Sequence, residues 1–309
     1  MSFGDHLEEL RKRLMLSLAA VFVCVIGMLP FKSWITDLYV APYRDMFRTG
    51  FVDHVEKVNS DVAAAGGVEA LRSQPGGELL IENYEFLRDY GDSILDRTYD
   101  FERFGPVIKR KGGYEVSYYL VATKPIEDFW TFMAASFLFS LLISGPFVIY
   151  QIWAFVSAGL YKRERAVVLR YLPGSALLFM MGGAFGYFVV VPYGLYFLVD
   201  LMNPGQVQPL ITVSTYFSLL FMLTAALGLV FQLPVVMLVL EKTGLVSHQT
   251  FVKNWRYVIL ILFVIAAVFT PPDPFTQGMM AGPMVILYVC GLWLTGRSAR
   301  SAGSAGGSA

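Results

Sequence analysis

The sequence predicts an all-α polytopic membrane protein that carries a small exported α+β insertion. Hydrophobic residues make up 56% of the 309 and charged residues only 16%, against roughly 25% charged in a soluble globular chain. Several apolar runs approach the length needed to cross a bilayer. The charges are also uneven, since residues 32–128 hold 12 bases and 17 acids whereas the rest of the chain holds 12 bases and 7 acids.

Six transmembrane spans are expected from windows of about 20 apolar residues. The fifth, "YVILILFVIAAVF", has 13 residues, which at about 1.5 Å each reach only about 20 Å. Because the hydrocarbon core is about 30 Å thick, this span must thin the bilayer, pack against longer neighbours or borrow flanking residues. The expected spans are roughly 14–31, 129–157, 167–199, 214–240, 257–269 and 275–294.

Prolines interrupt four of these spans, and a proline inside a membrane helix is tolerated where neighbouring groups satisfy the freed carbonyl. Two interpretations remain open. The prolines either kink ordinary helix packing, or they shape a bent, concave scaffold with a pocket on one side. The residues concerned are Pro146, Pro192, Pro234 and Pro283.

Lys and Arg in the short loops predict that both termini face the cytoplasm. The opposite loops, about 200–213 and 270–274, contain no base, and the long segment between the first two spans is then exported. The bases on the cytoplasmic side are Arg11, Lys12, Arg13, Lys162, Arg163, Arg165, Arg170, Lys242, Lys253, Arg256, Arg297 and Arg300.

The chain is expected to consist of a six-helix membrane domain over residues 1–300, an exported subdomain inserted at 46–113, and a flexible low-complexity tail at 301–309. Within the insertion, residues 84–104 mix aromatic and acidic residues at helical spacing. Residues 106–122 are typical of a β-hairpin around Lys111-Gly112-Gly113.

Groups that carry chemistry are scarce. The three histidines lie in separate loops without an acid or cysteine at ligand spacing, so we expect neither a metal site nor a cofactor, and no enzyme. Polar residues do occur at unusual places. Gln232 lies within the fourth span, where it either packs internally or faces a partner helix, and Thr270 and Gln277 flank "PPDP" at the ends of the fifth and sixth spans.

Five stretches in order resemble the TatC family, the polytopic receptor subunit of the twin-arginine protein translocase. The resemblance covers both ends and every expected span, leaving only about 46–113 and the tail without a match. The stretches are "HLEELRKRL" (6–14), "APY" (41–43), "YQIWAFVSAGLYKRERAVVL" (150–169), "FGYFVVVPYGLYFL" (185–198) and "FTPPDPFTQ" (269–277).

This resemblance implies a glove-shaped scaffold of six helices in the bacterial inner membrane. It also implies a function, which is to bind signal peptides with two consecutive arginines and to recruit single-span subunits of the TatB and TatA types. The family exports folded proteins using the proton-motive force. The resemblance implies neither a cofactor nor a nucleic-acid partner.

The resemblance places signal-peptide recognition on two carboxylates, Glu9 and Glu164, because a carboxylate accepts a guanidinium through two parallel hydrogen bonds. Arg11 and Phe155 also fall on matched positions. The alternative is that Glu9 pairs only with Arg13, and Glu164 with a neighbouring base. Glu8 has no match in the family, and it is spaced for a surface pair with Lys12.

One departure and one rival interpretation remain. Many family members carry glutamate where this chain has Gln232, so a mechanism that needs ionisation there is in doubt. The rival function is an ion-coupled secondary transporter, which needs ionisable residues near the membrane midplane. The spans contain almost none, since Asp200 and Glu241 lie at their ends.

Overall fold

The computed structural model describes residues 3–75, 77–96, 98, 113–114, 116–160, 162–201, 210–270 and 273–305. These residues form helices almost throughout and contain no strand, only an isolated bridge between Val121 and Thr212. The predicted all-α class is therefore confirmed. The helices are α1 (Phe3–Met28), α2 (Lys32–Ala64), α3 (Val68–Leu71), α4 (Gly77–Leu95), α6 (Glu127–Ala158), α7 (Lys162–Phe185), α8 (Val191–Asp200), α9 (Val213–Val230), α10 (Leu233–Lys242), α11 (His248–Lys253), α12 (Trp255–Phe269) and α13 (Pro274–Ala305).

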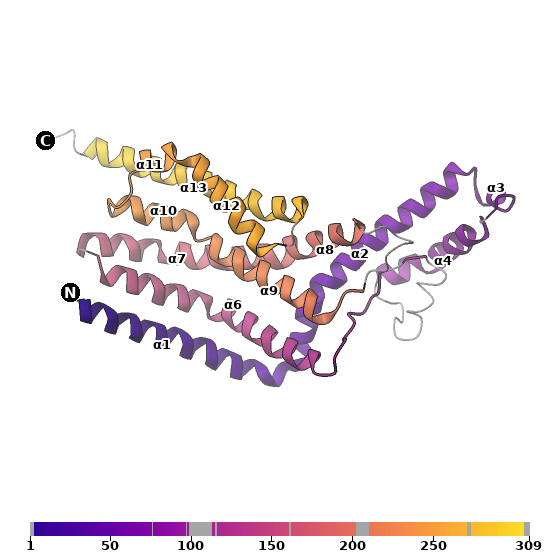
Figure 1. Ribbon diagram of the computed structural model, residues 1–309, viewed down its shortest axis with the longest axis horizontal. Helices are drawn as coiled ribbons and strands as arrows, with labels where there is room; N and C mark the ends of the chain where they lie inside the picture. The colour runs from indigo at the N-terminus through magenta and orange to yellow at the C-terminus, as the bar shows by residue number, and fades with distance from the viewer. Residues whose placement is uncertain are drawn as a thin grey trace. The chain divides into compact units, whose positions relative to one another are not determined.

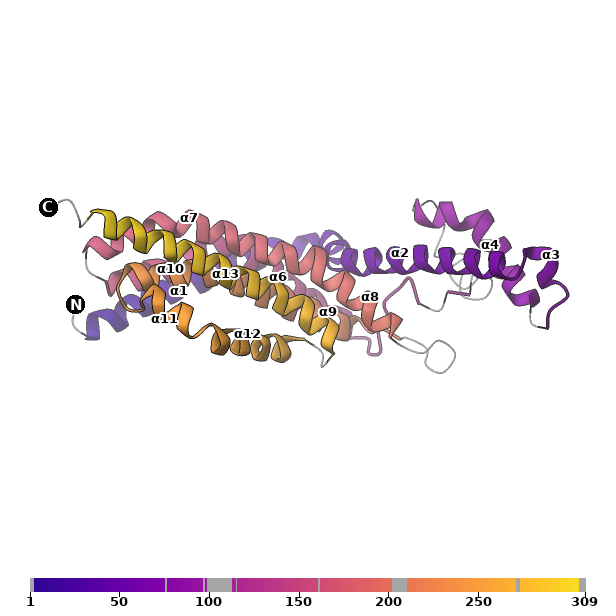
Figure 2. The same cartoon turned by 90° about the horizontal axis from the view of Figure 1, so that it is seen from above.

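The chain divides into two compact units. Unit 1 comprises Met1–Tyr39, Phe129–Val191 and Phe217–Ala309, and unit 2 comprises Val40–Asp128 and Pro192–Tyr216. In unit 1 the long helices lie side by side, with α1 next to α6 and α12 next to α13 (Figures 1 and 2).

Five helical segments within the described residues are long and apolar enough to cross a bilayer. They are His6–Ala64, Glu127–Ala158, Val168–Asp200, Val213–Lys242 and Pro274–Arg297. Helix α12 has only 15 residues, as expected for the short fifth span. The count of six spans stays a prediction.

Prolines account for part of the helix geometry. Pro146 and Pro283 lie inside helices that continue past them. Near Pro234 the fourth span breaks into α9 and α10 at a turn formed by Phe231 and Gln232. A proline lacks a backbone N–H and clashes with the carbonyl four residues earlier, so the break comes just before it. The third span contains a π-helix at Gly186–Val190, directly before Pro192.

The first predicted span, 14–31, differs from the helices found there. Helix α1 begins at Phe3 and its charged first turns are continuous with the apolar part. After a 3-10 turn at Leu29–Phe31, α2 starts at Lys32 and continues to Ala64 with Pro42 inside it. The sequence did not predict a helix over the polar residues of 43–64.

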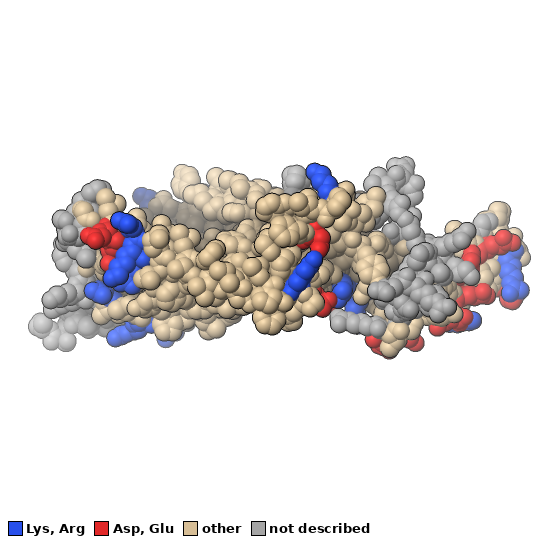
Figure 3. All heavy atoms as spheres, turned by 90° about the horizontal axis from the view of Figure 1, so that it is seen from below, with Lys and Arg blue, Asp and Glu red and all other residues tan. Residues whose placement is uncertain are grey.

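Charged and aromatic side chains mark the two ends of unit 1. On the face shown in Figure 3, charges gather where α1 begins, and a broad uncharged band follows, in keeping with the absence of any charge between Arg13 and Lys32. Four of the five tryptophans are exposed, three near the start of a helix and Trp293 near the end of the apolar segment Pro274–Arg297, whereas Trp153 is buried. Trp and Tyr gather at membrane interfaces in this way. The exposed tryptophans are Trp34, Trp130, Trp255 and Trp293.

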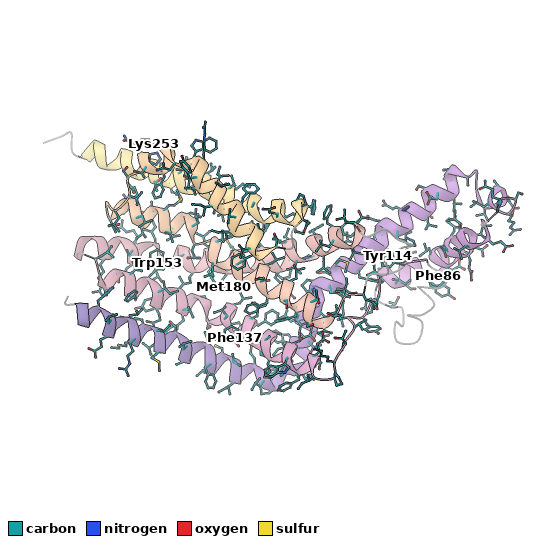
Figure 4. The ribbon with its side chains drawn as sticks, in the orientation of Figure 1. Phe86, Tyr114, Phe137, Trp153, Met180 and Lys253 are labelled. Carbon is teal, nitrogen blue, oxygen red and sulfur yellow. The ribbon has the colours of Figure 1, made fainter. Side chains whose placement is uncertain are left out.

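Unit 2 has an aromatic core. Tyr43, Phe47 and Phe51 follow one another at intervals of four residues on α2 and are almost fully buried. The ring of Tyr114 contacts those of Phe47 and Phe51 at centroid distances of 5.2 and 5.5 Å, and burial raises the pKa of the Tyr114 hydroxyl above its usual range. Figure 4 labels Tyr114 and also Phe86, a buried residue of α4.

The first arm of the predicted hairpin, residues 106–112, and residue 115 lie outside the described residues, so the hairpin stays a prediction, as do the domain boundaries. Val121, in its second arm, instead pairs with residues before α9, donating to the carbonyl of Ile211 at 3.1 Å. Helix α13 continues to Ala305, and residues 306–309 lie outside the described part of the chain.

Candidate functional site

The first candidate site is the line of contact between the start of α1 and the end of α6. His6, Glu9 and Arg13 lie three and four residues apart, so they share one face of α1. Gln151 and Phe155 share a face of α6 for the same reason. We call these five residues the α1–α6 seam.

Two contacts hold the seam together. The rings of His6 and Phe155 stack with centroids 4.6 Å apart and an interplanar angle of 25°. Further along the seam, the Arg13 guanidinium donates to two side-chain oxygens. Its Nε donates to Glu9 Oε1 at 2.7 Å, and its Nη1 donates to Gln151 Oε1 at 3.0 Å. Arg13 thus links a carboxylate on its own helix to an amide on the neighbouring helix.

The predicted recognition residues are placed as follows. Glu9 and Phe155 belong to the seam, and Arg11 is exposed on α1. Glu164 lies in the first turn of α7, shortly after α6 ends, and its side chain lies outside the described part of the structure. Phe155 thus contacts His6, three residues before Glu9, and for Glu164 the structure gives only the position of the backbone.

The alternative pairing of Glu9 with Arg13 does occur, as an i,i+4 ion pair whose two side chains are 22% and 25% exposed. Glu8 is exposed, and among the described side chains it forms no ion pair with Lys12. The two adjacent carboxylates thus have different surroundings, since only Glu9 turns towards α6.

A second candidate site lies on the other face of α6. A pocket of about 390 Å³ lies between α6, α9 and α10, and its lining is almost wholly apolar. Gln232 and Thr243 are its polar residues. The lining residues are Ile149, Ile152, Trp153, Val156, Leu160, Leu229, Gln232, Val236, Val239, Leu240, Thr243 and Leu245.

Gln232 is bonded inside unit 1. Its Nε2 donates to the Ser175 carbonyl at 3.0 Å, and its Oε1 accepts from the Ser175 hydroxyl. The same hydroxyl accepts from Trp153 Nε1 at 2.8 Å, and Figure 4 labels Trp153 between α6 and α7. All three side chains are buried. This geometry favours internal packing of the two alternatives for Gln232, while its partner-binding role stays a prediction.

The junction of α12 and α13 holds the other two predicted partner-binding residues. Thr270 is buried and its hydroxyl donates to the Ala266 carbonyl at 2.9 Å. Gln277 Nε2 donates to the Phe263 carbonyl of α12 at 3.2 Å. Asp273 accepts from the Thr276 N–H at 2.7 Å and so caps α13.

Sequence reasoning missed a buried carboxylate in unit 2. Glu127, at the start of α6, accepts hydrogen bonds from the N–H and hydroxyl of Thr123 at 2.7 and 2.9 Å, from Lys124 N at 3.2 Å and from Ser214 N at 2.8 Å. It thereby caps the first turn of α9 and holds the 121–124 segment. We call this arrangement the Glu127 clamp. Gln151 was missed as well, because only its contact with Arg13 in the folded structure identifies it as part of the site.

Comparisons with known proteins agree with this architecture. The sequence model of one family, described as Sec-independent protein translocase protein (TatC), matches residues 5–283. The TatC protein of Koribacter versatilis is 38% identical over 195 residues, which are 63% of this chain and 71% of that protein. The Aquifex aeolicus TatC is 33% identical over 218 residues, 70% of this chain and 89% of that protein.

A solved structure is similar along nearly the whole chain. The crystal structure of a protein described as the twin-arginine translocase receptor TatC superposes with a TM-score of 0.63 and 26% identity. The match covers 95% of this chain and 99% of that one.

Proposed function

We propose a function from one premise: this chain belongs to the TatC family of Sec-independent protein translocase proteins. It is accordingly a multi-pass membrane component of that translocase. Its function, in our proposal, is to bind twin-arginine signal peptides at the cytoplasmic ends of α1, α6 and α7. It then recruits single-span partner subunits, and folded cargo crosses the membrane at the expense of the proton-motive force.

The observation that carries the proposal is the position of Glu9. It lies in the last charged stretch before the apolar part of α1, its side chain is only 22% exposed, and it shares a helical face with His6 and Arg13, which contact α6. Partial burial reduces solvent screening of a charge pair. A carboxylate in that position can bind a guanidinium more strongly than a fully solvated carboxylate can.

Glu164 supplies the second carboxylate in this proposal. It follows α6 by one short connection, because α6 ends at Ala158 and α7 begins at Lys162. The end of α6 already contacts the start of α1 through Phe155 and His6. Two carboxylates on separate elements can bind two consecutive arginines, and Arg11 and Phe155 shape the surroundings.

Peptide binding to the purified full chain in nanodiscs tests this assignment. Glu9→Ala and Glu164→Ala should each lower the affinity for a twin-arginine peptide by at least tenfold. Truncating one partner of a buried charge pair costs about 2–5 kcal/mol, and about 1.4 kcal/mol is a factor of ten. Glu→Gln should be nearly as harmful, because it keeps the shape and removes the charge.

Glu8→Ala is the matched control, one residue away and exposed. It should leave the affinity unchanged, and a twin-lysine peptide should bind the wild type weakly. If Glu9 were only a solvated i,i+4 pair, worth about 0.2–0.5 kcal/mol, the three alanine variants would behave alike. That result would remove the recognition site from Glu9 and Glu164.

Partner recruitment is proposed at the α12–α13 junction. Helix α12 is short, and its exposed apolar side chains are available to a second helix, with Gln277 partly exposed beside them. Thr270 and Gln232 are assigned to the same role from their position alone. Cysteines placed at Thr270 and Gln277 should crosslink to a TatB-type or TatA-type helix. Efficient crosslinks elsewhere with none here would rule out this surface.

The orientation is part of the same proposal. Both termini face the cytoplasm, which places the α1–α6 seam on the side from which precursor proteins arrive. The bases clustered at that end support it. A reporter fused to residue 309 and one inserted at residue 75 should report opposite sides of the membrane.

A further inference from the structure

The Arg13 guanidinium contacts the carboxylate that the proposed function assigns to signal-peptide recognition. Its Nε is bonded to Glu9 Oε1 at 2.7 Å, and its Nη1 to Gln151 at 3.0 Å. Gln151 is 4% exposed, so it is a fixed partner on α6. Arg13 is therefore held by two helices rather than being a freely moving surface side chain.

This contact changes the charge that an incoming peptide meets. Glu9 and Arg13 together carry no net charge, so a cation approaching Glu9 gains little from simple attraction. The carboxylate still has hydrogen-bonding capacity, because two oxygens accept about four hydrogen bonds and Arg13 uses one of them.

The remaining capacity suits one kind of ligand. A guanidinium presents a planar fork of N–H donors that reaches both carboxylate oxygens, whereas an ammonium binds mainly as a point charge. A carboxylate that is already paired with Arg13 thus keeps most of its contribution to binding arginine, and it loses most of its contribution to binding lysine.

We propose that Arg13 is a specificity-determining residue, which by neutralising Glu9 makes the site select arginine over lysine in the signal peptide. This inference rests on the proposed function of Glu9 as a recognition carboxylate. It assigns Arg13 a second effect besides joining α1 to α6.

The test compares twin-arginine and twin-lysine peptides of otherwise identical sequence, with both dissociation constants measured by isothermal titration on the full chain in nanodiscs. Arg13→Gln should lower the arginine-to-lysine preference by about fivefold, which is ~1 kcal/mol at a factor of ten per 1.4 kcal/mol. Most of the change should be a gain in affinity for the lysine peptide. Arg13→Lys keeps the charge and should retain the preference.

Lys12→Gln is the matched control. It removes one positive charge from the same helical turn, and Lys12 is exposed and outside the seam. Its preference should equal that of the wild type. If Arg13→Gln left the arginine-to-lysine preference unchanged, or lowered the affinity for both peptides equally, Arg13 would have a structural role only. Either result would overturn the inference.

A measurement on the wild type avoids any effect of substitution on folding. A peptide with both arginines dimethylated keeps its charge but loses bidentate hydrogen bonding. It should bind like the lysine peptide, and binding like the arginine peptide would contradict the inference. The proposed function fails separately, if the wild type shows no preference for arginine or if Glu9→Ala has no effect.

Discussion

Glu9 and Glu127 are both carboxylates near the start of a helix, yet their surroundings are opposite. Glu9 is partly exposed, and its recorded contact is a single bond from a charged side chain. Glu127 is 7% exposed and accepts four bonds, all from neutral donors of the backbone or a hydroxyl. One is in unit 1 and the other in unit 2.

The difference separates a binding role from a structural one. The Glu127 clamp is satisfied by groups that cannot leave without unfolding the turns they belong to, so it has little capacity for a ligand. Among the described side chains, Glu9 accepts a hydrogen bond from Arg13 at Oε1 only, and it lies beside a helix end that carries several bases. A carboxylate that is fully satisfied by fixed donors stabilises the fold, and one that is half satisfied at a surface can recognise a cation.

The largest expected effect is on stability, from Glu127→Ala. The change leaves the N–H groups of Thr123 and Ser214 without their acceptor, and buried donors without partners are costly. We expect the largest loss of thermal stability among the single substitutions, with peptide affinity per folded molecule unchanged. Melting in detergent, followed by peptide titration below the transition, measures both.

Two companion variants make this result specific. Glu127→Gln keeps one oxygen for the Thr123 donors and should recover part of the stability. Glu78→Ala removes an exposed carboxylate of α4 in the same unit and should change nothing. If Glu127→Ala melted like the wild type, the contrast with Glu9 would lose its basis.

A smaller loss is expected from Ser175→Ala, which extends the comparison to neutral groups. Ser175 joins Trp153 to Gln232, so its loss leaves a buried N–H and a buried amide oxygen with one partner fewer. The cost should be about 1–3 kcal/mol, read as a lower melting temperature.

Ser136→Ala is the control for Ser175→Ala. Ser136 is equally buried, but its hydroxyl bonds only to the Phe132 carbonyl of its own helix, at 2.8 Å. Equal melting temperatures for the two variants would show that the bonds between helices add nothing.

The smallest effect on peptide affinity is expected from deleting residues 46–113 and rejoining the ends with a short turn. The cut divides α2 and removes Phe47 and Phe51, so unit 2 loses core contacts. Peptide affinity should stay at the wild-type value, because every residue of the α1–α6 seam lies in unit 1. Lost binding in a variant that still folds would show that the insertion contributes to recognition.

Hydropathy predicted the apolar helices well. The second span was expected at 129–157 and α6 extends over Glu127–Ala158, and the short fifth span matches α12. Helix α2 was not predicted. Beyond residue 43 its composition is polar, and the aromatic residues that bury one face recur only at every fourth position. Gln232 was placed inside a helix, whereas Pro234 ends α9 before it.

The contacts of the candidate sites could not be predicted. Arg13 and Gln151 are 138 residues apart, and Glu127 and Ser214 are 87 apart. A single sequence shows which residues share a helical face, and from this Glu9 and Arg13 could be paired. It does not show which face of another helix lies opposite, and that face decides whether a carboxylate is satisfied or left available.

The distribution of the tryptophans has an optical consequence. Four indoles lie exposed near the ends of apolar helical segments, whereas Trp153 is buried with its N–H bonded to Ser175. Lipids brominated near the headgroups should therefore quench most of the intrinsic fluorescence and leave a residual emission from Trp153. That residual signal comes from a ring in the wall of the 390 Å³ pocket. Its wavelength and lifetime would report the filling of this pocket without any label being attached to the protein.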